Sequence, residues 1–186
     1  PAATPVTSDD GEGTMPRVTA RYADAALAAF RRDQRRFGSG VIFVPPSNQK
    51  TVSIEGYELL SRLGQGSVGV VWKARSQQNG TTVGIKVISP SLTRNPELLG
   101  KFQKAFERAS AIEHPNLVRL GKLSRSGDIH YYTMEFVEGE SLADRVERGG
   151  PLPASRVREV AREVARSLSH VHKQRFLHGG IRPSNV

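Results

Sequence analysis

Short apolar runs alternate with polar turns through most of the C-terminal two-thirds of the chain. Asn79-Gly80 separates two of these runs and is a typical two-residue hairpin turn. A second turn, Ser126-Gly127-Asp128, separates two later runs. Strands are therefore expected at residues 54–62, 69–75, 81–88, 117–123 and 130–136. Runs joined by such short turns predict an antiparallel sheet.

Apolar residues at helical spacing mark three further segments, expected as helices at 96–112, 142–148 and 154–174. The first presents Leu98, Leu99, Phe102, Ala105, Phe106 and Ala109 on one face. Ser141 is a good N-cap for the second. The third carries an apolar stripe with Arg and Glu opposite, made of Val157, Val160, Ala161, Val164, Leu168 and Val171. A small sheet leading into helices predicts an α+β fold.

The first 51 residues differ in character from the rest. Residues 1–16 hold almost no large apolar side chain and are expected to be disordered. Residues 18–37 predict a helix with a cluster of four arginines at its C-terminal end (Arg31, Arg32, Arg35 and Arg36). This helix either packs on its own domain or docks on an acidic surface. A short strand or apolar anchor at 41–44 and a polar linker complete the region 17–51. A sheet-containing domain is expected at 52–137, followed by a helical part at 138–186.

The bulk composition narrows the classes of partner. The 186 residues carry a net charge of +9, which allows contact with acidic partners. Aromatic residues make up only 6% and show no stacking pattern, which argues against specific nucleic-acid recognition. There is no cysteine, no secretory signal and no apolar run long enough for a transmembrane span, so a cytoplasmic location is expected. The apolar stripe of 154–174 is expected to be covered by a partner protein or by a continuation of the same chain.

The most informative motif is Gly64-Gln65-Gly66-Ser67-Val68-Gly69, with glycines at G-x-G-x-x-G spacing. Glycine lets a hairpin tip approach a phosphate where a Cβ would clash, and the backbone N–H groups can then meet the anion. Alone, this spacing is also found in ordinary glycine-rich turns. Here it connects strand to strand and is followed by Val83-Gly84-Ile85-Lys86, whereas a Rossmann turn leads into a helix.

From Tyr57 to Val186 the chain resembles the N-terminal part of a bacterial-type Ser/Thr protein kinase domain. The matching motifs, in order, are the glycine loop, Lys86, His114-Pro115-Asn116, Met134-Glu135-Phe136-Val137-Glu138-Gly139 and the segment His178 to Asn185. The resemblance implies a sheet-containing N-lobe with the helix called C, followed by the first helices of a truncated C-lobe.

The resemblance also implies roles for individual residues. The adenine would lie against Leu63 and Val71, and the phosphates under Gly64, Gly66 and Gly69, with Lys86 paired to the α- and β-phosphates. Met134 takes the gatekeeper position, and the backbones of Glu135 and Val137 would contact the adenine. Asn185 takes the position of a magnesium ligand. Gly84 stands where the family usually has alanine, which predicts a roomier pocket floor.

Several positions depart from the family pattern. Ala105 occupies the helix-C position of the glutamate that holds the strand lysine, and Glu107 and Glu113 point about 200° and about 80° away from it at ~100° per residue. Gly180 occupies the position of the aspartate that accepts the substrate proton. Gly179 and Arg182 replace an arginine and a lysine of the same loop. The D-F-G segment is not in this sequence, and no residue is assigned a catalytic role.

Three hypotheses follow. The first is a pseudokinase that acts in binding, scaffolding or regulation, with ATP binding that is weak or independent of magnesium. The second is an active Ser/Thr kinase with an atypical catalytic loop, favoured by the retained glycine loop, Lys86 and Asn185. The third is a structural subunit of a larger assembly, attached through helix 18–37 and the chain ends.

Overall fold

The computed structural model describes residues 52–66 and 68–186. The predicted helix at 18–37, the strand at 41–44 and the disorder of residues 1–16 lie outside the described residues.

The sheet has five antiparallel strands in the order β1-β2-β3-β5-β4, which confirms the predicted architecture. The strands are β1 (Tyr57–Gly66), β2 (Gly69–Ser76), β3 (Thr82–Ile88), β4 (Leu120–Ser126) and β5 (Ile129–Glu135). Asn79 closes the β2–β3 turn, because its side-chain oxygen accepts the N–H of Thr81 at 3.1 Å. The turn glycines Gly80 and Gly127 have φ of 71° and 56°, which explains why glycine stands there.

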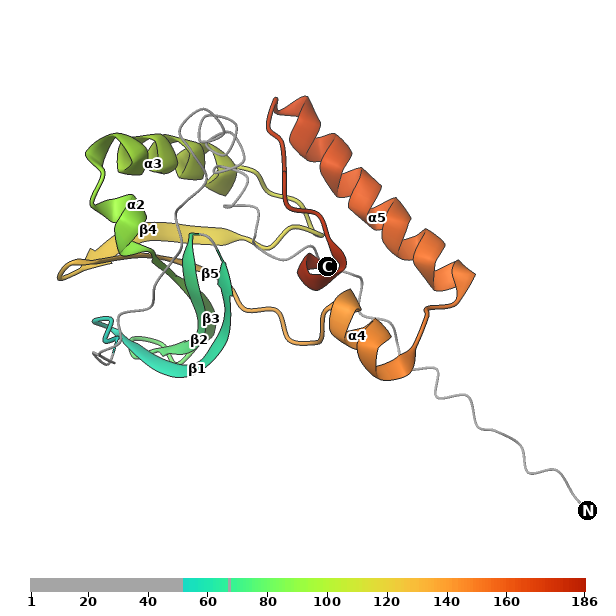
Figure 1. Ribbon diagram of the computed structural model, residues 1–186, viewed down its shortest axis with the longest axis horizontal. Helices are drawn as coiled ribbons and strands as arrows, with labels where there is room; N and C mark the ends of the chain where they lie inside the picture. Colours follow the sequence, from blue (N-terminus) through green and yellow to red (C-terminus); the bar gives the residue numbers. More distant parts are fainter. Residues whose placement is uncertain (1–51, 67) are drawn as a thin grey trace, which may run out of the picture.

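Each of the two helices beside the sheet begins after a polar N-cap residue. Helix α2 (Pro90–Thr93) begins after the N-cap Ser89, and helix α3 (Pro96–Ser110) begins after Asn95, whose side chain accepts the N–H of Leu98 at 3.2 Å. Helix α3 lies across one face of the sheet (Figure 1). The one-turn helix α2 was not predicted, because four residues are too few to show helical periodicity.

The two faces of the sheet carry separate cores. Beneath α3 and α2 the buried side chains form what we call the α3 core, made of Val68, Ile88, Leu92, Phe102, Phe106, Val118, Tyr132 and Met134. Within it, the rings of Phe106 and Tyr132 lie 4.9 Å apart. The opposite face buries Ile54, Ala74, Ile85 and Tyr131. The alternation along β3 therefore sends Ile85 to one core and Lys86 with Ile88 to the other.

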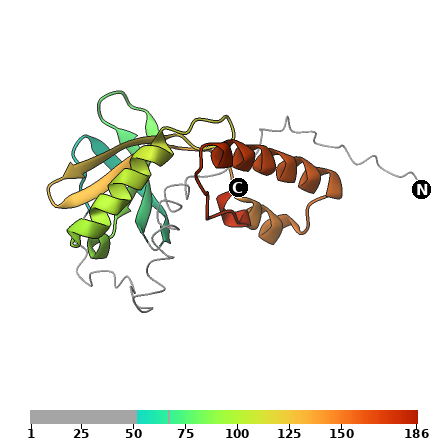
Figure 2. The ribbon, with the colours of Figure 1, turned by 90° about the horizontal axis from the view of Figure 1, so that it is seen from above.

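The helical half follows β5 through an extended connection (Figure 1). It holds α4 (Leu142–Gly149), α5 (Ala154–Lys173) and the short 3-10 helix η1 (Pro183–Asn185). Seen from above, the sheet with α3 lies on one side of the connection and the helices α4 and α5 on the other (Figure 2). The N–H of Leu142 donates to the carbonyl of Val186 at 2.8 Å, so the end of the described chain closes against the start of α4.

The apolar stripe predicted for α5 is only partly buried. Val160 and Val171 are buried, and the partly buried Val164 packs against the same hydrophobic cluster as Val171. Val157, by contrast, is 50% exposed. Leu177 and Ile181, which follow the helix, are also exposed at 54% and 40%. No helix of residues 52–66 and 68–186 has both the length and the apolar character needed to cross a bilayer.

Candidate nucleotide-binding site

The glycine hairpin, defined here as the β1–β2 tip between Gly64 and Gly69, is built on two opposed glycines. Gly66 pairs with Gly69 as the last register pair of the two strands. A Cβ on Gly64 would meet nothing within 4 Å, so this part of the hairpin is open. Leu63 precedes it and is 51% exposed, as expected for a side chain that covers a ligand rather than a core.

Lys86 faces the side of the sheet on which α3 packs. It pairs with Val71 on β2 and with Tyr132 on β5, and it is only 2% exposed. Lys86 is therefore buried in the interior and does not face solvent as an ordinary strand lysine would.

The residues predicted to hold an adenine lie at the end of β5 and in the connection that follows it. Strand β5 ends at Glu135, and the chain continues through Val137. The Glu135 carboxylate accepts the N–H of Arg119 at 3.3 Å. Lys73 Nζ lies 4.5 Å from the centroid of the Phe136 ring, a cation–π contact that joins β2 to this connection. No sequence pattern indicated this contact, because it links two motifs through side chains that neither motif specifies.

The expectation that glycine at position 84 makes the pocket floor roomier is wrong. Gly84 pairs with Met134 across β3 and β5. A Cβ built on Gly84 would lie 2.7 Å from Met134 Cγ and 3.4 Å from its sulfur. The methionine therefore fills the space that an alanine methyl would take. An unbranched thioether adapts easily to such a gap.

We expect Gly84→Ala, which installs the residue more usual in the family, to lower the free energy of unfolding by about 1–3 kcal/mol through overpacking against Met134. Urea denaturation of the single variants and of Gly84→Ala/Met134→Ala measures the coupling. Removing Met134 should relieve the clash, so the double variant should be more stable than the sum of the single effects predicts. Additive effects would show that Met134 does not occupy this space.

The loop after α5 keeps an ordered arrangement around Gly180. His178 is 1% exposed, and its Nδ1 accepts the N–H of Gly180 at 3.3 Å. The Asn185 amide nitrogen donates to the carbonyl of Gly180 at 2.5 Å from a position that is also 1% exposed. Gly179 has φ 63°, which glycine adopts at low cost. The loop backbone is thus fixed from both sides, while position 180 carries no side chain.

Asn185 is the one predicted metal-binding residue in the described chain, and its chemistry fits a hard cation. Its amide nitrogen is engaged by Gly180, and the amide oxygen is the atom type that Mg²⁺ accepts. One amide oxygen does not make a metal site, and no cluster of three or more His, Asp or Glu that could hold a metal ion occurs within 52–66 and 68–186.

Helix α3 offers no carboxylate at the predicted position. Ala105 is half-buried between the buried residues Phe102 and Phe106, on the helix face turned to the α3 core. Glu107 and Glu113 are both exposed. The exposure of Glu107 agrees with the angle estimated from the helical wheel, whereas Glu113 lies beyond the end of α3, where that angle does not apply.

His114 joins the two halves of the chain. Its Nδ1 accepts the N–H of Asn116 at 3.1 Å and lies 3.4 Å from Ser167 Oγ on α5. Its ring centroid is 5.3 Å from that of His170. Burial, and after it the neighbouring His170, lower the pKa of His114, while Glu163 acts in the opposite direction. The neutral ring suits an unprotonated Nδ1 acceptor, so the contacts of His114 are structural.

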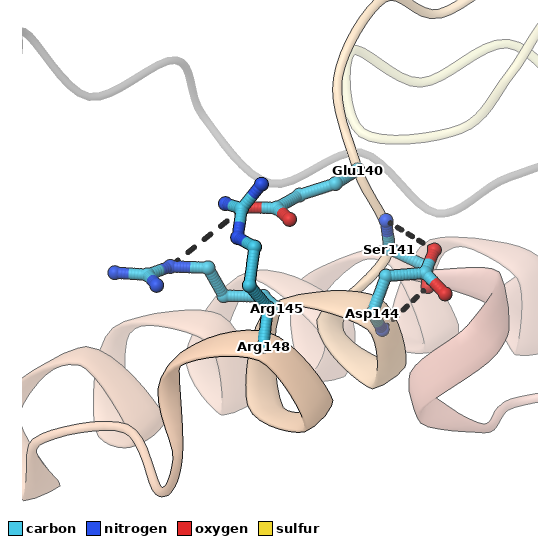
Figure 3. Close-up of polar contacts among 5 residues, drawn as sticks. All are labelled: Glu140, Ser141, Asp144, Arg145 and Arg148. Carbon is cyan, nitrogen blue, oxygen red and sulfur yellow. Dashed lines mark hydrogen bonds and ion pairs between the residues drawn. The ribbon is translucent and has the colours of Figure 1, made fainter.

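Helix α4 begins after the connection that follows β5, and polar contacts of its own hold it (Figure 3). Ser141 Oγ accepts the N–H of Asp144 at 3.2 Å, and the Asp144 carboxylate accepts the N–H of Ser141 at 3.4 Å, forming a capping box. Glu140 accepts from Arg148 at 2.6 Å and lies 3.8 Å from Arg145 Nε. Because these ion pairs are largely exposed, their effect on stability is small, and the cap does more to fix where the helix starts.

Comparison with known proteins agrees with this geometry. A profile of the protein kinase domain matches residues 57–186. The chain belongs to the protein kinase family. It is 31% identical over 130 residues to a probable serine/threonine-protein kinase of Clostridium perfringens, covering 70% of this chain and 19% of that protein. It is 28% identical over the same length to the serine/threonine-protein kinase PrkC of Bacillus subtilis, covering 20% of it.

Solved structures lead to the same family. A double mutant of the Mycobacterium tuberculosis PknI kinase domain matches with a TM-score of 0.63 and 25% identity over 73% of this chain and 56% of that one. The kinase-like chain thus spans about a fifth of the curated relatives' length and just over half of the solved kinase domain. Protein kinases generally use ATP and magnesium.

Within this kinase-like fold, the predicted site residues come from three places. The glycine hairpin, Val71 and Lys86 lie on β1 to β3, and Met134, Glu135 and Val137 lie at the end of β5 and just beyond. Asn185 and Gly180 lie together in the loop that ends the described chain. One residue that the sequence predictions missed is Val68, which no residue-type rule singled out and whose burial depends on the fold of the hairpin.

Proposed function

We propose that this chain is the nucleotide-facing part of a pseudokinase, a kinase-like domain that serves binding, scaffolding or regulation rather than phosphotransfer. The observation that carries the proposal is Gly180. The backbone around it is ordered by His178 and Asn185, yet the position has no group that could accept a proton. A positioned acid–base group contributes roughly 10²–10⁴-fold in rate.

The other site residues support nucleotide binding without transfer of the substrate proton. The glycine hairpin presents backbone N–H groups toward phosphates, Lys86 supplies a cation, and the connection after β5 supplies main-chain groups for a purine. ATP, when bound, would supply the phosphoryl group and magnesium would neutralise its charge. Because Ala105 cannot hold Lys86 by an ion pair, the lysine is not oriented in the way usual for the family, and weak or magnesium-independent ATP binding is expected.

The second candidate is an active kinase with an atypical catalytic loop. Retention of Asn185 favours it, since its amide holds the loop carbonyl at 2.5 Å and keeps an oxygen for a cation. In that case a proton acceptor must come from outside the described residues.

A partner or a further part of the polypeptide is also proposed for the helical half. Val157, Leu177 and Ile181 are 40–54% exposed. They lie along and after α5, the helix whose apolar stripe is only partly covered by the described residues. In this proposal the basic segment 18–37 would provide a separate contact with an acidic surface.

The test is a phosphotransfer assay on the full-length protein with ATP and either magnesium or manganese. We expect turnover at the level of the buffer blank and no further decrease in Lys86→Ala. Isothermal calorimetry on the same samples should show weak ATP binding that is lost in Lys86→Ala. Brisk phosphorylation that Lys86→Ala abolishes would instead establish the second candidate.

A further inference from the structure

The C-terminal end of α5 is a Schellman motif with an arginine at the position where glycine is usual. The N–H of Phe176 donates to the carbonyl of Val171 at 3.2 Å, and the N–H of Arg175 donates to the carbonyl of His172 at 2.8 Å. Val171 and Phe176 also belong to one buried hydrophobic cluster, as is common for this motif. Arg175 has φ 54°, and within residues 52–66 and 68–186 it is the only non-glycine residue with a positive φ.

A side chain of α3 holds this turn. A left-handed backbone is unfavourable for an L residue, because its Cβ crowds the following carbonyl oxygen. The carbonyl of Arg175 accepts a hydrogen bond from Nη2 of Arg108 at 3.3 Å. The guanidinium carbon of Arg108 also lies 5.8 Å from the centroid of the Phe176 ring, within the range of a cation–π contact. Arg108 therefore contacts two successive residues of the turn and favours the conformation in which both contacts can form.

Arg108 stands in the last turn of α3, where the helix meets the helical half. The next residue, Ala109, is buried in the same cluster as Val171 and Phe176. Ala105, one helical turn earlier, has no carboxylate with which to hold Lys86. The contacts described for this end of α3 therefore run to the helical half of the chain.

The turn leads directly into the loop that contains Gly180. Only Leu177 separates Phe176 from His178, whose Nδ1 accepts the N–H of Gly180 at 3.3 Å. The Asn185 amide nitrogen donates to the carbonyl of Gly180 at 2.5 Å. The direction of the chain at the turn thus decides where these groups lie.

We propose that Arg108 is a positioning residue that ties α3 to the turn after α5 and thereby orders the loop around Gly180. It acts through the carbonyl of Arg175 and the ring of Phe176. The tie needs no bound nucleotide, so it goes beyond the proposed function and succeeds or fails independently of it.

The test compares backbone hydrogen exchange in the full-length parent protein, in Arg108→Gln and in the control Lys104→Gln. Both residues are exposed on α3, and both changes remove one positive charge. Glutamine has a helix propensity close to that of arginine and lysine, and at position 108 it ends two atoms short of the arginine Nη2. The buried cluster and the contact between His114 and Ser167 remain in both variants, so the fold should persist.

We expect the loop amides to exchange about threefold faster in Arg108→Gln and at the parent rate in Lys104→Gln. The informative amides are those of Phe176, Gly180 and Asn185, all of which are hydrogen-bonded in the parent. Unchanged exchange of these amides in Arg108→Gln would overturn the tie, even if the variant melted at a lower temperature.

A rescue variant separates the tie from a general loss of stability. Glycine adopts a left-handed backbone without steric cost, so Arg175→Gly favours the turn by itself. Added to Arg108→Gln, it should return the loop amides to about the parent rate of exchange. The last turn of α3 should still exchange faster than in the parent, because its contact with the turn is not restored. If the loop amides stay as fast as in Arg108→Gln alone, Arg108 stabilises α3 only and the tie is wrong.

Discussion

Gly69→Ala is expected to lower the free energy of unfolding by about 3 kcal/mol or more. The new methyl would lie 1.8 Å from the Val87 carbonyl oxygen, a distance that requires the β2–β3 ladder to open. The backbone at φ 156° adds strain, since L side chains rarely adopt it and such strain is worth ~1–3 kcal/mol. Overpacking against backbone adds a further ~1–3 kcal/mol. Urea denaturation followed by circular dichroism measures the change.

Gly100→Ala provides the matched control. Gly100 lies within α3, and a Cβ there meets nothing within 4 Å. Alanine is the better helix former, so this variant should be more stable by about 0.5–1 kcal/mol. Similar destabilisation in both variants would mean that the close approach of Gly69 to Val87 is not the cause of the effect.

This prediction separates two roles of the glycine motif. Gly64 has open space around it and is free to face a ligand. Gly69 is required by the fold itself, because β2 passes too close to β3 for any side chain. A glycine motif can therefore persist in a chain for structural reasons, and its presence alone is weak support for phosphate binding.

Most of the architecture could be predicted from the sequence because it depends on local periodicity. Alternating apolar residues and the Asn79-Gly80 turn indicated the strands, and the helical stripe from Leu98 to Ala109 indicated α3. These features need only the period of a strand or helix and the position of its turns.

The features that could not be predicted depend on contacts between elements. The alternation along β2 breaks at Gly69, so no count along the chain places Val68 in the α3 core. At Gly84, the family comparison suggested free space, but Met134 on a strand far along the sequence fills it. Packing of this kind depends on which side chains meet in three dimensions, and the pattern of residues along the sequence does not contain that information.

Gly180→Asp should have the largest effect on activity. The Gly180 backbone lies outside the positive-φ region, so an L residue can adopt it without the backbone strain expected at Gly179, where φ is 63°. The contacts from His178 and Asn185 go to the backbone N–H and carbonyl of residue 180 and do not depend on its side chain. An aspartate placed there can accept a substrate proton, and phosphotransfer by the full-length protein should rise by about 10²-fold or more.

Gly180→Asn separates proton acceptance from the presence of a side chain. The carboxamide has nearly the size and shape of the carboxylate and cannot act as a base, so its phosphotransfer rate should stay at that of the parent. Adding Ala105→Glu to Gly180→Asp should raise the rate further if a carboxylate on α3 can orient Lys86. Equal rates in the aspartate and asparagine variants would show that the missing proton acceptor is not what limits this chain, and the pseudokinase proposal would then have to rest on Lys86 and its surroundings.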